Sequence, residues 1–129
     1  MDLIDCILEN RFIKGLYPGG VSNDICVGHL GFNADADFSL DIHVRTPPFQ
    51  EVKKWGVWGR DYDRVVFVMR GTHIDNIDIF GCERFDFQRL SCSNIDGRFY
   101  FELAGSNWKI AFSFKNLTIQ QSRTYISDD

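Results

Sequence analysis

Apolar and polar residues alternate in several segments of the chain, and this period of two is typical of β-strands with one buried face. The clearest segment is FSLDIHVR at residues 38–45, in which every second residue is apolar. Residues 25–32 are predicted to form its partner strand, with a turn at residues 33–37. The strand should stop at the Pro-Pro pair of residues 47–48, because proline has no N–H to donate to a sheet.

The second half of the chain predicts more strands of this kind. Residues 64–70 are apolar throughout their middle, so this strand should lie centrally in a sheet, and Gly71 with Thr72 should then turn the chain. The other segments with strand character are residues 73–80, 85–92, 99–103, 108–114 and 117–125. No helix is predicted between the strands, and parallel strands need crossover helices, so the sheet should be antiparallel.

The N-terminal segment carries the only helical pattern. Asp2 is a candidate N-cap, and Gly15 is the expected end of the helix. The apolar stripe at helical spacing consists of Leu3, Ile4, Ile7, Leu8 and Phe12. The whole pattern predicts one domain, residues 1–129, that is mainly β (α+β by strict count). Its expected form is an antiparallel sandwich or half-open barrel of seven to eight strands with one N-terminal helix.

Composition agrees with this fold class and narrows the choice of partner. Among 129 residues there are twelve Phe, three Trp and four Tyr, which suit a β-sheet core. The formal net charge is −4, from fourteen Asp and four Glu against nine Arg and five Lys. This balance argues against nucleic acid as a partner, since its binders usually carry a basic patch, although a mildly acidic surface is also ordinary for solubility.

The four cysteines are Cys6, Cys26, Cys82 and Cys92, and none is in the C-x-x-C spacing of a zinc site. The first residues lack the basic start and long apolar run of a signal peptide. No stretch approaches the ~20 apolar residues of a membrane span. We therefore expect a cytoplasmic protein with unpaired cysteines that binds neither a metal nor a membrane.

Motifs for catalysis are weak throughout the chain. His29, His43 and His73 lie on predicted strands, where a three-histidine metal site is conceivable but a solvated histidine is commoner. A nucleophilic Cys–His pair would have to join Cys26 or Cys82 to His29 or His73, and nothing nearby activates either thiol. No G-x-S-x-G, H-E-x-x-H or phosphate-loop motif occurs. The expectation is a binding protein without catalytic residues or cofactor, not an enzyme.

Two groups of aspartates are candidates for a functional surface. Asp35, Asp37 and Asp41 form the first, and Asp61 with Asp63 forms the second. Paired carboxylates serve hydrolysis or divalent metal binding. The spacing here fits no calcium loop, however, and aspartate is an ordinary turn residue.

Two tryptophans, Trp55 and Trp58, lie in the connection after the Pro-Pro pair, within the segment KKWGVWGR. Interface hot spots favour Trp and Arg, so this segment is a candidate anchor for a protein partner. The alternative is that both rings cap the end of the hydrophobic core.

The chain also has a recognisable order of features: the strand FSLDIHV, the Pro-Pro stop, the Trp-bearing connection, DRVVF, the hairpin GTHIDNIDIFG and the closing FSFKNLTIQQSRTYI. Over roughly residues 36–126 this order resembles small β-rich immunity proteins of bacterial polymorphic and contact-dependent toxin systems. The resemblance implies a cytoplasmic, non-enzymatic protein that binds a toxin domain and blocks its active site. It transfers no residue roles.

The implied toxin partner would suit an acidic surface, because many such toxin domains act on nucleic acid and are basic. Residues 24–78 hold nine acidic side chains against six Lys or Arg, and opposite charge speeds association. A small-ligand carrier remains an alternative and needs an aromatic-lined pocket of about 300 Å³ or more in a barrel interior. An enzyme of unknown class is less favoured, and the oligomeric state is left open. The expected partner-binding residues are Asp35, Asp37, Asp41, Asp61, Asp63, Trp55 and Trp58.

Overall fold

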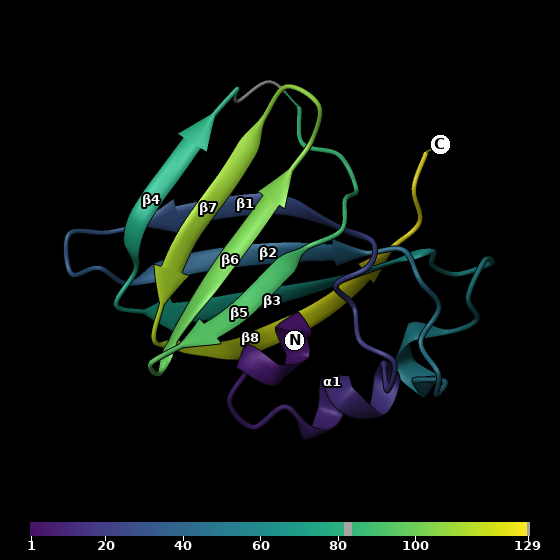
Figure 1. Ribbon diagram of the computed structural model, residues 1–129. Helices are drawn as coiled ribbons and strands as arrows, with labels where there is room; N and C mark the ends of the chain where they lie inside the picture. The colour runs from purple at the N-terminus through teal and green to yellow at the C-terminus, as the bar shows by residue number, and fades with distance from the viewer. Residues whose placement is uncertain (82–83, 129) are drawn as a thin grey trace.

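The computed structural model describes residues 1–81 and 84–128, and within these ranges eight strands form two antiparallel four-stranded sheets (Figure 1). The first sheet has the order β1-β2-β3-β8, and the second has the order β4-β7-β6-β5. The strands are β1 (Ile25–Phe32), β2 (Phe38–Val44), β3 (Arg64–Thr72), β4 (Asp75–Phe80), β5 (Ser91–Ile95), β6 (Arg98–Ala104), β7 (Lys109–Phe114) and β8 (Asn116–Tyr125).

The chain moves between the two sheets twice. The strands β1, β2 and β3 follow one another in the first sheet, and the chain then crosses to β4 at the edge of the second. The strands β5, β6 and β7 run as a second meander, after which β8 returns to pair with β3. This confirms the mainly β, antiparallel prediction, with two packed sheets rather than a closed barrel.

Aromatic rings fill the space between the two sheets. Phe101 and Phe112 of the second sheet stack with centroids 4.6 Å apart. Phe38 of the first sheet packs against Phe112 and Phe114, each with a centroid distance of 5.4 Å. All four rings are buried, so inward-facing Phe residues form a solid core here.

The predicted N-terminal helix is two short helical turns instead. The 3-10 turn η1 (Leu3–Cys6) and the helix α1 (Arg11–Leu16) are separated by Glu9, whose φ is 52°. Asp2 caps η1 as expected, whereas α1 continues through Gly15 to end one residue later.

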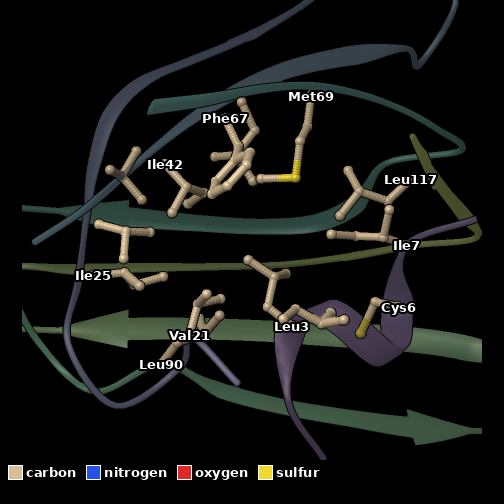
Figure 2. Close-up of a cluster of buried hydrophobic side chains, with 14 of the residues drawn as sticks. Leu3, Cys6, Ile7, Val21, Ile25, Ile42, Phe67, Met69, Leu90 and Leu117 are labelled. Atoms are coloured by element: carbon tan, nitrogen blue, oxygen red, sulfur yellow. The ribbon is translucent and has the colours of Figure 1, made fainter. Parts of the chain in front are cut away.

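The break lets η1 turn its apolar side chains onto the sheets. Leu3, Ile4 and Ile7 are buried, and Figure 2 shows Ile7 beside Leu117 of β8. The backbone N–H of Leu8 donates to the carbonyl oxygen of Leu117 at 2.9 Å. This segment therefore covers the sandwich on its β8 side.

Two strand predictions were wrong in their limits. Gly71 and Thr72 belong to β3 rather than to a turn, and Gly71 is required there because a Cβ would lie 2.1 Å from the ring of Phe38. The chain turns instead at His73, whose φ is 58°.

The second wrong prediction is the strand over residues 85–92. Residues 85–90 contribute only an isolated bridge between Gln88 and Ile25, and the strand begins later, at Ser91 of β5.

Candidate functional site

Asp35 and Asp37 lie in the turn between β1 and β2, as expected. Oδ1 of Asn33 accepts hydrogen bonds from the backbone N–H of Asp35 at 3.0 Å and of Asp37 at 3.3 Å. Neither carboxylate forms an ion pair with a residue that the structure describes. The N–H of Ile74 donates to the carbonyl oxygen of Ala36 at 2.9 Å, so this turn also holds the start of the β4 segment.

Asp41 lies on the outer face of the first sheet, two residues before His43 on the same strand. Its carboxylate is 3.5 Å from the guanidinium of Arg123 on β8, and only 18% of the side chain is exposed. Asp41 is therefore largely covered by its own ion pair, unlike the two turn aspartates.

The two tryptophans lie in the connection between β2 and β3, where they cover one end of the hydrophobic core. Trp55, at the end of the 3-10 turn η2 (Lys53–Trp55), is buried and packs edge to face against Phe12 and Tyr62 at 6.2 and 5.9 Å. Trp58 is half-buried, with its ring 5.2 Å from that of Tyr62. Both rings therefore pack at the end of the core, which is the alternative to a partner-binding anchor. Trp55 has little surface left for a partner.

Asp61 and Asp63 are engaged by their own chain. Oδ2 of Asp61 accepts a hydrogen bond from the N–H of Val57 at 2.7 Å, and this bond, together with Arg60, lowers the pKa of the carboxyl. The carboxylate of Asp63 accepts from both the hydroxyl and the N–H of Ser127 at 2.7 Å.

The hydrogen bonds from Ser127 hold the pKa of Asp63 below its usual value, with the hydroxyl contributing most and Arg64 adding a smaller effect from 3.4 Å. Asp63 thereby fastens the end of the chain to the start of β3.

The structure does not bring the two aspartate groups together. The β1–β2 turn lies at one end of the first sheet and the β2–β3 connection at the other (Figure 1). The seven residues of β2, among them Asp41, lie between the turn aspartates Asp35 and Asp37 and the connection that carries Asp61 and Asp63, a span of about 20 Å at ~3.3 Å per residue. One compact partner site does not include both groups.

A cavity of about 670 Å³ opens on the outer face of the first sheet, next to the C-terminal residues 125–128. Its wall includes Phe87, whose ring lies under the guanidinium of Arg45 at 4.3 Å and that of Arg64 at 5.4 Å. Arg45 is paired with Asp24 at 2.6 Å, and Arg64 is close to Asp63. These two arginines therefore hold the ring of Phe87 against the outer face of the first sheet.

Cys26 lies opposite His43 in this cavity, and not beside His29 or His73. Burial raises the pKa of the Cys26 thiol, with Asp86 adding to the effect, and Sγ contacts the carbonyl oxygen of Phe85 at 3.5 Å. A thiol that stays protonated is a poor nucleophile. The other candidate, Cys82, lies outside the described residues.

Cys6, Cys26 and Cys92 carry free thiols. Residues 1–81 and 84–128 contain no cluster of three or more His, Cys, Asp or Glu side chains placed to hold a metal ion. No helix in the described part of the chain is long and apolar enough to cross a membrane.

The sequence did not single out β4 as a functional feature. All six residues of β4 are exposed, including Ile77, Ile79 and Phe80. Alternation predicted a strand here but not its place at a sheet edge, which depends on long-range pairing. Asp75 and Asp78 could have indicated from the sequence that this strand lies at an edge, because charged residues are common on edge strands.

Asp75 and Asp78 both form ion pairs in which the carboxylate is the more exposed partner. Asp75 is 4.0 Å from Arg98, with side chains 69% and 21% exposed. Asp78 is 3.4 Å from Lys109, with side chains 61% and 30% exposed. Lys109 also lies 3.9 Å from Glu102, so one cation serves two carboxylates. The surface offered to solvent is acidic although cations lie beneath it.

Comparison of the chain with protein-family models, with curated proteins and with solved structures found no match.

Proposed function

We propose that this chain is an immunity protein that neutralises a cognate toxin domain by binding it. The observation that carries the proposal is the acidic end of the sandwich, which we define as Asp35, Asp37, Asp75 and Asp78. The contact of Ile74 with Ala36 holds the two halves of this surface together. The resemblance to β-rich immunity proteins supplies the toxin as the partner.

The acidic end suits a basic protein partner for a physical reason. Asp35 and Asp37 have no ion pair among the described residues, and the cations paired with Asp75 and Asp78 lie deeper than the carboxylates. Exposed charge of one sign attracts the opposite charge over distances near the ~8–10 Å Debye length, which speeds association. A toxin domain with a basic nucleic-acid-binding surface would be captured in this way, and its active site would be covered.

The carrier alternative has less support, because the inner-face rings occupy the interior. The stacked pair of Phe101 and Phe112 lies where a barrel ligand would need space. The cavities of about 670 and 330 Å³ open on the surface of the first sheet instead.

The experiment is co-expression of the tagged chain with the product of the neighbouring upstream gene, followed by co-purification and measurement of association rates. Removing the acidic end by Asp35→Asn, Asp37→Asn, Asp75→Asn and Asp78→Asn should slow association about tenfold at low salt. The control removes four other exposed charges by Glu9→Gln, Glu51→Gln, Asp86→Asn and Asp96→Asn, and it should change the rate much less.

Failure of any protein to co-purify, with a small metabolite instead raising the melting temperature, would refute the immunity proposal in favour of a carrier. Equal slowing by both sets of four substitutions would mean that only net charge matters and that the acidic end is not the binding surface.

A further inference from the structure

The strand β4 offers an unpaired backbone edge. It is the terminal strand of the second sheet, and within residues 1–81 and 84–128 its one partner strand is β7. Apart from this ladder with β7, no backbone hydrogen bond reaches β4 from the described residues. Both edges of the first sheet carry a contact from outside that sheet: the N–H of Leu8, just after η1, donates to Leu117 of β8, and the start of β1 bridges to Gln88. The other edge of the second sheet is β5, which carries no Asp or Glu among Ser91–Ile95 and so lacks the charges that border β4.

A bulge limits the usable edge to residues 77–80. The register with β7 shifts between Asp75 and Asp78, and Asn76 has a φ of 52°. Bulges twist an edge strand away from regular pairing. Four residues remain in which side chains alternate regularly.

The register shows which side chains face which way. Ile79 lies opposite Ile110, so it points to the inner side of the sheet, and Ile77 shares that side. Asp78 lies opposite Ala111 and therefore points outward. Ile77 and Ile79 are exposed despite facing inward, because nothing in the described chain covers the border where β4 ends the sheet.

The charges on the outer side select the chemistry of an added strand. Lys109 is shared between Asp78 and Glu102, which leaves an excess of negative charge beside the edge. The cation nearest to Asp75 lies against the sheet, since Arg98 donates to the hydroxyl of Ser113 at 2.8 Å and only 21% of its side chain is exposed. An incoming strand with Lys or Arg opposite Asp78 and apolar residues opposite Ile77 and Ile79 would satisfy both sides.

We infer that the partner toxin domain adds a strand to the free edge of β4 at residues 77–80, with alternating apolar and cationic side chains. Strand addition supplies affinity through backbone hydrogen bonds and specificity through alternate side chains. The inference rests on the proposed function and names its binding mode. A second copy of this chain is a poorer occupant, because pairing β4 with itself brings the carboxylates of Asp75 and Asp78 toward those of the other copy.

The first test needs no toxin. A seven-residue peptide of alternating Lys and Val, capped at both ends, is titrated into the full chain while the backbone amides are followed by NMR and hydrogen exchange. Shifts and added protection should centre on residues 77–80. A Glu–Val peptide of the same length should bind at least about tenfold more weakly, because like charges oppose pairing.

Equal binding of both peptides, or shifts centred elsewhere, would overturn the inference. Protection of residues 77–80 that rises with protein concentration alone would identify a second copy as the occupant and would overturn it too.

The second test uses the co-purified toxin. Ile79→Lys and Ile79→Asp each place a charge on the inner side of the edge, so both should weaken binding by about tenfold or more whatever the sign of the charge. Ile95→Lys and Ile95→Asp are matched controls at an exposed site on β5, the opposite edge of the same sheet. They should change binding less than about twofold, which is the scale of a surface substitution.

The two proposals fail in different ways. A toxin that binds the Ile79 and Ile95 variants equally well leaves the immunity function standing and removes the β4 mode. The absence of any protein partner removes the function, and the peptide titration then decides whether the edge accepts a strand.

Discussion

His43 and Tyr125 meet across the outer face of the first sheet, with Nδ1 of the imidazole 2.8 Å from the phenolic oxygen. Their rings lie edge to face with centroids 5.5 Å apart. A Cβ at Gly28 would come within 2.3 Å of Nε2 of His43, so glycine there makes room for the ring. Burial lowers the pKa of His43, and the positive charges of Arg123 and Arg64 lower it further against the opposing effect of Asp41.

Acid should therefore weaken the fold through His43. The unfolded chain takes up a proton at this residue below about pH 6.5, whereas the folded protein resists protonation until a lower pH. The contribution of neutral His43 to the free energy of unfolding is fully present above about pH 6.5. It is lost as the pH falls toward the lower pKa of the folded state. Urea unfolding at pH 7.5 and 5.0 should show a smaller loss for His43→Gln than for the parent protein. An unchanged loss would mean that this imidazole is not responsible.

Asp2 should contribute more to stability than its terminal position suggests. Desolvation opposes ionisation, but hydrogen bonds from the N–H groups of Ile4, Ser22 and Val21 lower the pKa of its carboxyl overall. Asp2→Ala leaves these donors without their acceptor and should cost about 1–3 kcal/mol in the free energy of unfolding. Asp5→Ala is the control, since that carboxylate accepts a single exposed bond. Equal losses would contradict the anchoring role.

Phe112 should be among the most sensitive core positions. Its ring contacts Phe101, Phe38 and Phe114, which come from both sheets. Phe112→Ala opens a cavity at this junction and should cost about 3–5 kcal/mol. Phe49→Ala removes an equal ring from an exposed site and should change stability by less than about 0.5 kcal/mol. Chemical denaturation of both variants measures the difference.

Sequence periodicity predicted β1 at residues 25–32 and β2 to within one residue, since β2 ends at Val44 rather than at Arg45. Burial alternates strictly along β2, whereas β1 has a bulge between Val27 and His29. It failed at β5, where only Cys92 is buried. The signal for this hairpin was the pair Asp96 and Gly97, whose φ values of 54° and 82° fit a two-residue turn with both φ angles positive. Turn chemistry marks this strand better than hydrophobicity does.

The candidate surface was harder to predict than the strands. Asp37 and Asp63 are similar turn residues in sequence, yet only Asp63 finds a distant donor, Ser127. The exposed edge of β4 depends on which strand pairs with which, and periodicity carries no information on that. Local pattern therefore predicts strands, while the accessibility of a charge depends on contacts between residues far apart in the chain.

The difference between the two aspartate groups gives the last prediction. Asp63→Asn removes an acceptor from Ser127 and weakens the contact with Arg64, so it should lower the free energy of unfolding by about 1–2 kcal/mol. The pair Asp35→Asn and Asp37→Asn loses no such bond and should leave the free energy of unfolding within about 0.5 kcal/mol of the parent value.

Binding of the toxin should respond to these substitutions in the opposite order. The turn pair should slow association with the toxin at low salt and reduce its salt dependence, because those carboxylates are free to attract a basic partner. Asp63→Asn should leave the association rate unchanged wherever the variant is folded. Stopped-flow rates at 20 and 300 mM salt, with unfolding curves for each variant, measure both effects. A toxin whose association slows for Asp63→Asn and not for the turn pair would move the binding surface to the other end of the first sheet.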